Sequence, residues 1–336
     1  MSLWFFLVAL VPPVMFAVSN LIDKSVMHGE EGDESPWAVV ALGAFFDLIF
    51  LIPIGLYCLV TINWPMADIF WPLFFNGISV TLAGWLFYRS IQTEETSRVV
   101  AIFQTIPIFG LFLGFYGLEE KLGWEIILAI IFLVLGGFTL SISKGKFNKR
   151  ILAMMLLSSA LYAVNDFVLA KYGREIFGGE VGNSISLVGQ AMPAIMADLA
   201  GKVFFGIIVL VGRRERTSFK NSFRAKFGLV GVSSIIYTAG DVVFDLAKLF
   251  APIALVQALG CTQPMFVLIW GILSTSIFIP HLLKKRNWIL KKENRRIKLI
   301  EKTTKFCLKT RESLKGTTWK VAGIILMVVG GILLSI

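Results

Sequence analysis

Histidine and cysteine are nearly absent from this sequence, which has two histidines and three cysteines among its 336 residues. His28 and His281 lie outside the apolar segments, and no two cysteines have the spacing of a metal site, a redox motif or a disulfide framework. The HExxH, GxSxG and P-loop patterns are also missing. The sequence therefore predicts neither an enzyme nor a bound metal or cofactor.

Charge is scarce as well. Only 16% of the residues are charged, against roughly 25% in an average soluble domain, and 56% are hydrophobic, with a mean hydropathy of +0.78. The length alone would allow two soluble domains, but the long apolar runs exclude them. Because only helices and closed barrels satisfy their backbone groups in lipid, apolar runs of about 18 or more residues predict spanning helices. We therefore expect an all-α polytopic membrane protein.

About ten transmembrane helices can be placed along the chain. The expected spans are 3–23, 37–60, 69–90, 97–117, 123–142, 150–172, 188–212, 227–249, 251–279 and 318–336. No lysine or arginine precedes Lys24, so we interpret the first segment as a retained helix and not as a secretory signal. Pro36 after Ser35 is typical of a helix start. The ninth span is long enough to tilt or to end in a re-entrant piece.

The two halves of the chain repeat the same features in the same order. The matching pairs are 16–20 with 162–166, Asp47 with Asp198, Pro107 with Pro264, Trp124 with Trp319, and Gly136-Gly137 with Gly330-Gly331. Chance similarity among apolar segments is the alternative. Because each half holds five spans, an odd number, the second half must enter the membrane in the opposite direction. The sequence thus predicts two inverted five-helix repeats, 1–143 and 149–336.

A basic insertion at 281–316 interrupts the second repeat, and its excess of lysine and arginine equals the formal net charge of the whole chain, +10. One hypothesis is an amphipathic helix that binds anionic membrane lipids through 284–315. The alternative is a solvated loop whose charge only sets the orientation of the protein. A basic run can also bind nucleic acid, but no fold motif supports that reading, and we expect no nucleic-acid partner.

The basic residues also predict an orientation. The connections at 144–150 and 213–226 are basic and lie on the same side as the insertion, whereas the other side has only Lys121, Lys171, Arg174 and Lys248. The positive-inside rule places the basic side in the cytoplasm. We therefore expect a multi-pass protein of the cytoplasmic (inner or plasma) membrane with both termini facing outward.

Several short motifs, in this order, resemble the drug/metabolite transporter superfamily, specifically its ten-helix EamA type. They are the first helix around 16–24, Tyr88, Pro107, the run Leu118-Glu119-Glu120 followed by Leu122-Gly123, and the Gly136-Gly137 helix. The resemblance covers nearly the whole chain. It implies a membrane transporter of amino acids, nucleotide-like or drug-like compounds.

This sequence departs from the family pattern in three respects. Ser276 stands in the second half where Glu119 stands in the first, and the basic insertion is unusual. Many members are expected to have cytoplasmic termini, which conflicts with the orientation that the basic residues indicate here.

Charged residues inside the spans are the sharpest indication of a functional site. A charged residue at the bilayer centre costs about 2.5–3.5 kcal/mol on insertion scales, so it should face a polar cavity or a partner. The candidates for substrate binding or proton coupling are Asp47, Asp198, Lys202, Asp241, Asp245, Asn20, Asn165 and Asp166. Asp241 or Asp47 could bind an amine or exchange a proton, since removal from water favours the neutral carboxyl form. The alternative for each is a structural bond, such as Asp198 with Lys202 four residues later.

Polar and aromatic residues beside two prolines extend the candidate site. Pro107 and Pro264 are expected to kink their helices and free backbone groups for a substrate. Plain packing kinks are the alternative. The remaining candidates are Gln104, Gln257, Gln263, Tyr88 and Trp85.

These features favour a secondary transporter that moves a small polar or amphiphilic metabolite, with export as the expected direction. The alternative is a non-transporting membrane scaffold or lipid-binding regulator that acts through the basic insertion. Deletion of 284–315 would abolish the function of a scaffold, and Asp241→Asn would abolish transport. A channel is disfavoured because no filter-like motif is present.

Overall fold

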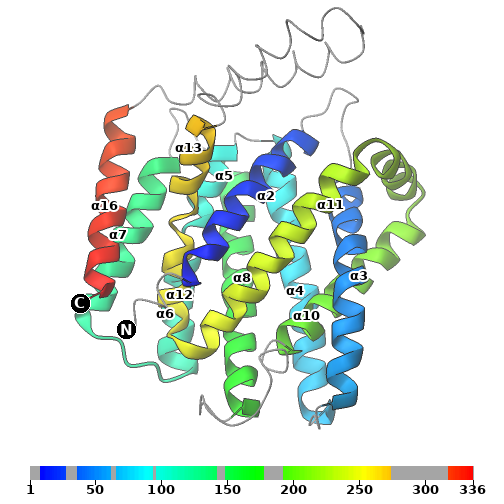
Figure 1. The fold of residues 1–336 in the computed structure, drawn as a ribbon, viewed down its shortest axis with the longest axis horizontal. Helices are drawn as coiled ribbons and strands as arrows, with labels where there is room; N and C mark the ends of the chain where they lie inside the picture. Colours follow the sequence, from blue (N-terminus) through cyan, green and yellow to red (C-terminus); the bar gives the residue numbers. More distant parts are fainter. Residues whose placement is uncertain are drawn as a thin grey trace, which may run out of the picture.

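A computed structural model describes residues 8–27, 36–61, 66–93, 96–141, 148–177, 192–273 and 317–335. In these residues helices are the only regular secondary structure, and they pack as a bundle (Figure 1). The first half forms α2 (Val11–Met27), α3 (Pro36–Thr61), α4 (Met66–Thr93), α5 (Thr96–Phe103), α6 (Ile106–Gly117) and α7 (Trp124–Ser141). The second half forms α8 (Lys149–Phe177), α10 (Met192–Val211), α11 (Arg213–Phe250), α12 (Ile253–Gly260), α13 (Gln263–Leu273) and α16 (Thr317–Ser335).

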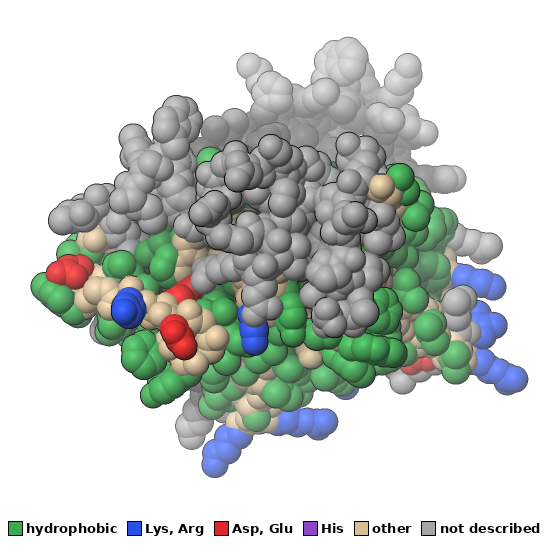
Figure 2. Space-filling view, turned by 90° about the horizontal axis from the view of Figure 1, so that it is seen from below, with side chains coloured by type: hydrophobic (Ala, Val, Ile, Leu, Met, Phe, Trp, Pro, Cys, Tyr) green, Lys and Arg blue, Asp and Glu red, His purple; other side chains and the backbone are tan. Residues whose placement is uncertain are grey.

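The outer surface of the bundle is apolar. Within the described ranges, three helical segments have the length and hydropathy needed to cross a membrane, namely Phe70–Thr93, Lys149–Tyr172 and Phe227–Lys248. On α3, exposed hydrophobic residues recur at helical spacing from Phe45 to Val60. In the view from below, hydrophobic side chains form most of the visible described surface, and charged ones are isolated (Figure 2). A stripe of this kind suits contact with lipid, because a lipid-facing surface is apolar, whereas a water-facing surface is mostly polar.

The sequence suggested that the fourth and ninth expected spans are single, kinked helices. The structure differs. Each divides into two short helices, α5 with α6 and α12 with α13. Pro107 and Pro264 are the second residues of α6 and α13, where a missing N–H leaves no helix bond unmade. The chain therefore breaks before each proline, and the proline starts the next helix.

The two breaks have the same local structure. At each break a threonine directs both its backbone N–H and its hydroxyl to a carbonyl three residues earlier: Thr105 bonds Ile102, and Thr262 bonds Leu259. Cys261 lies 3.8 Å through its Sγ from the carbonyl oxygen of Gln104, so the two breaks face each other. The carbonyls and amides freed there are held by local bonds instead of by a continuous helix.

The basic connection predicted at 213–226 is also different in the structure. It is helical and belongs to α11, a single helix of 38 residues. Lysine, arginine and alanine are good helix formers, so a basic segment can continue a spanning helix beyond the bilayer. The insertion at 281–316 lies outside the described residues.

Helices from the two halves interleave around the centre. α4 packs on α8 and α11 on α2, while α10 contacts both α3 and α4. α7 and α16 pack along each other at one edge of the bundle (Figure 1). The contact is close because glycines face it: a Cβ on Gly136 would lie 2.8 Å from the carbonyl oxygen of Gly323. Small residues of this kind let spanning helices approach. The interleaving leaves polar side chains of many helices facing the middle.

Candidate functional site

A cavity of about 240 Å³ lies at the centre of the bundle. Its walls include residues of α2, α3, α4, α6, α8, α10, α11 and α12. Most of the site residues predicted from the sequence line it, namely Asn20, Asp47, Tyr88, Gln104, Pro107, Asn165, Asp166, Asp198, Lys202, Asp241, Asp245, Gln257 and Gln263. The charged and polar residues selected from the apolar helices therefore line one shared cavity.

Trp85 and Pro264 are the predicted residues that do not line the cavity. The indole of Trp85 stacks on that of Trp37 with ring centroids 5.0 Å apart, so it contributes to packing between α3 and α4. Pro264 starts α13 next to the break.

One ion-pair cluster in the wall centres on Lys202. Its Nζ lies 2.7 Å from Asp198 on the same helix and 3.1 Å from Asp47 on α3. Thr238 of α11 donates its hydroxyl to the other oxygen of Asp47. Two carboxylates therefore share one ammonium, and three helices are joined at this point.

A second, more deeply buried cluster centres on Lys248. Its ammonium binds Asp166 of α8 and Asp245 of α11 and lies 4.5 Å above the ring of Phe244. Gln257 of α12 donates to the second oxygen of Asp166 at 2.7 Å. Gln257 can reach it because Gly110 has no side chain: a Cβ there would overlap the Gln257 amide.

Asp23 is a third acidic position, at the α2 end of the cavity. Tyr88 donates to one oxygen over 3.1 Å, and Ser233 donates to the other over 2.6 Å. Among the described residues, this carboxylate accepts hydrogen bonds from hydroxyl groups and forms no ion pair with a cation.

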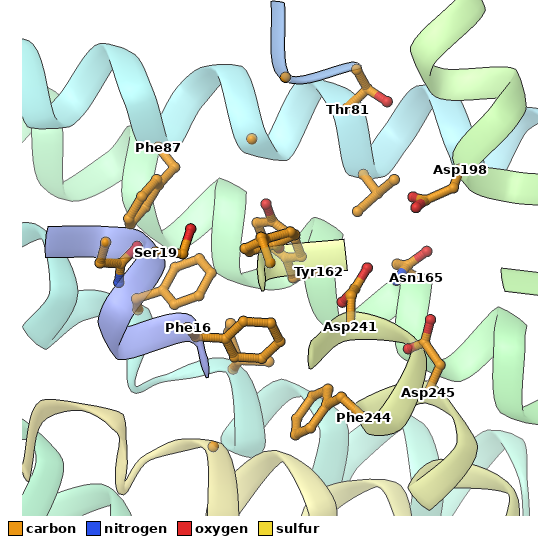
Figure 3. A pocket seen from close by; sticks show the side chains of 18 of the residues that line it. Phe16, Ser19, Thr81, Phe87, Tyr162, Asn165, Asp198, Asp241, Phe244 and Asp245 are labelled. Carbon is orange, nitrogen blue, oxygen red and sulfur yellow. The ribbon is translucent and has the colours of Figure 1, made fainter. Parts of the chain in front are cut away.

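Asp241 lies between the two lysine clusters and is close enough to both lysines to interact with them electrostatically. It forms no hydrogen bond or ion pair with another residue in the described part of the chain. Figure 3 shows its carboxyl group directed into the cavity, with Phe16 and Phe244 beside it and Asp198 across from it. It is the carboxylate best placed to meet a ligand.

The sequence reasoning missed several of these residues. Asp23 lies three residues after Asn20 and follows the same rule of charge within an apolar helix, so it could have been found. Lys248 lies at the end of an expected span and was counted with the connections. In the structure only 2% of its side chain is exposed. Its position three residues after Asp245 was the available signal.

The charges of the cavity do not balance. Six aspartates and two lysines line it, which leaves four negative charges if all are ionised. Buried, uncompensated charge is costly, so such carboxylates hold protons or a bound cation. In the described ranges no group of three or more histidine, cysteine, aspartate or glutamate side chains is arranged to hold a metal ion.

An apolar helical bundle with a polar central cavity is the architecture of a multi-pass membrane transporter. In a comparison with known proteins, residues 3–142 match the EamA-like transporter family. Residues 3–142 are therefore similar to a family of membrane transporters, the EamA-like family.

The fold extends over both halves. A solved crystal structure matches 100% of this chain and 97% of its own, with a TM-score of 0.60 and 10% sequence identity. At this identity the match shows the fold alone. No curated protein matched the sequence.

Proposed function

We propose that this protein is a secondary transporter. Its central cavity would bind a small polar or amphiphilic metabolite with a protonated amine, which the protein moves across the cytoplasmic membrane. The excess of carboxylates over lysines supports the cationic class. The single observation that carries the proposal is Asp241, which is directed into the cavity and has no ion-pair or hydrogen-bond partner among the described residues.

The two lysine clusters indicate how an amine would be recognised. In each cluster an ammonium binds two aspartates, and at Lys248 an aromatic face completes the site. Asp241 with Phe16 and Phe244 offers the same combination of carboxylate and ring, without a lysine. An amine of the substrate would occupy that position.

The transport cycle would use the two halves as inverted repeats that rock around the cavity. Three observations support this division. Packing of α4 on α8 parallels that of α11 on α2, packing of α6 on α8 parallels that of α13 on α2, and the breaks at Thr105 and Thr262 have the same bonds. Alternating exposure of a central site is the mechanism associated with such repeats.

Coupling to protons follows from the same excess of charge. When the cavity is empty, surplus carboxyl groups would retain protons, because ionised groups without partners are costly there. An entering ammonium would displace them. Binding of substrate would thus release protons and link the two movements.

A ligand screen tests the proposed function. The purified protein is unfolded thermally in the presence of amines, amino acids and anionic metabolites, because a ligand of the folded state raises the melting temperature. We expect amines to stabilise the wild type and not Asp241→Asn. Glu125→Gln is the matched control, an acid-to-amide change at an exposed position outside the cavity.

Two outcomes would contradict the proposal. One is stabilisation by anions and not by amines. The other is stabilisation only by anionic lipids that is lost when 284–315 is deleted, which would favour the lipid-binding scaffold.

A further inference from the structure

Two carboxylates of the cavity, Asp23 and Asp241, have no lysine partner among the described residues, and both lie along α11. Asp23 and Asp241 both line the cavity, and Ser233 ties Asp23 to α11. Ser233 precedes Asp241 by eight residues on that helix, which corresponds to about 12 Å at 1.5 Å per residue. The other four aspartates of the cavity share the two lysines.

The wall between these two carboxylates is aromatic. α2 and α11 both contribute to it, and the rings of Phe16 and Tyr237 lie 5.0 Å apart. Phe16 also contacts Phe244 edge-on, with centroids 5.9 Å apart. In Figure 3 Phe16 and Phe244 lie beside Asp241, and Ser19 lies beyond Phe16 as seen from Asp241. An apolar stretch thus separates two acidic ends.

We infer that the cavity binds a linear diamine, with one ammonium at Asp241, the other at Asp23, and the alkyl chain along Phe16 and Tyr237. This inference rests on the proposed function and names its substrate class. A single ammonium would leave one of the two carboxylates without a cation. A dication with an apolar middle matches the charges and the aromatic wall at once.

The geometry also sets the length of the ligand. The axial rise of about 12 Å from Ser233 to Asp241 serves as an approximation to the separation of the two carboxylates. Subtracting an ammonium–carboxylate contact of about 2.8 Å at each end leaves roughly 6 Å between the nitrogens. With C–C bonds of about 1.5 Å, an extended chain of about four to six methylenes spans that distance or slightly more. Ethylenediamine is too short to reach both carboxylates.

The test compares probes by calorimetric titration of the purified full-length protein. The probes are butylamine, ethylenediamine, putrescine, cadaverine and hexamethylenediamine. We expect putrescine or a longer diamine to bind about ten-fold or more tightly than butylamine, because its second ammonium forms a further charge-assisted hydrogen bond at Asp23. Asp23→Asn should bring the ratio of the two dissociation constants close to one, and Glu125→Gln should keep it.

Asp23→Glu guards against a variant that simply fails to fold. It keeps the charge but extends the side chain, so the best diamine should become shorter. Equal dissociation constants for butylamine and all diamines in the wild type would overturn the inference and leave the amine transporter intact. If no amine binds at all, both proposals fail.

Discussion

Lys248 shows how a cation can be held inside this bundle. It is almost fully buried between Asp166 and Asp245. Breaking such a pair by removing one partner leaves buried charge uncompensated and costs about 3–5 kcal/mol. We expect Lys248→Met to lower the free energy of unfolding by that amount, measured by chemical unfolding in detergent.

Lys121→Met is the control for this prediction, because Lys121 is exposed in the connection between α6 and α7. It should change stability by less than about 0.5 kcal/mol. A Lys248→Met protein as stable as the control would mean that the aspartates around it are protonated and that the cluster is not an ion pair.

Competition between protons and amines is a second consequence of the acidic cavity. An ammonium binds the ionised form of Asp241, and a fall in pH converts that carboxylate to the neutral acid. We therefore expect the affinity for amines to fall as the pH is lowered, with protons released on binding. Calorimetric titration at several pH values gives the change in affinity, and repeating it in buffers of different ionisation enthalpy gives the number of protons released. Affinity that is unchanged by pH, with no proton release, would exclude proton exchange at this site.

At the level of the helices, α7 and α16 depend on glycine for their close contact. A Cβ at Gly136 would lie 2.7 Å from the Met327 Cγ and 2.8 Å from the Gly323 carbonyl oxygen. Because backbone cannot move aside cheaply, we expect Gly136→Ala to destabilise the protein by about 1–3 kcal/mol, measured by thermal unfolding.

Gly206→Ala in α10 is the matched change, since nothing lies within 4 Å of its Cβ position. Alanine is the better helix former there, so the variant should be neutral or more stable by up to about 1 kcal/mol. Equal losses at both positions would show that helix packing at Gly136 is not the cause.

The helices also show what the sequence could and could not predict. Apolar runs located the spans because lipid forces each run to satisfy its own backbone. The breaks before Pro107 and Pro264 could not be distinguished from kinks, since one proline produces either, depending on the bonds that Thr105 and Thr262 make. The basic charge at 213–226 indicates a connection, whereas the helix propensity of the same residues favours the helical start of α11 that the structure has.

The sequence predicted most of the residues that line the cavity but not how their side chains pair. Charge within apolar helices indicated Asp47, Asp198 and Asp241. The difference between them arises from tertiary structure: Asp47 and Asp198 share Lys202, whereas Asp241 is unpaired among the described residues. Sequence spacing alone predicted that Asp198 can pair with Lys202, four residues later. It could not show that Asp47 binds the same ammonium group.

For the molecule as a whole, the orientation in the membrane stays a prediction. Three basic segments on one side place that side in the cytoplasm and both termini outside. A reporter that is active only in the cytoplasm, fused after Ile336, should then be silent, and one inserted within 281–316 should be active. A bright signal after Ile336 would reverse the orientation and favour the topology expected for many EamA-type proteins.

Counterflow in proteoliposomes tests most directly whether the acidic central cavity binds and transports a cationic amine. Vesicles that contain the protein are loaded with an unlabelled amine that stabilises it, and entry of the labelled amine is followed. We expect the wild type and Glu125→Gln to accumulate the label and Asp241→Asn to remain at the level of empty vesicles. Accumulation by Asp241→Asn at the wild-type rate would contradict a transport site at this carboxylate.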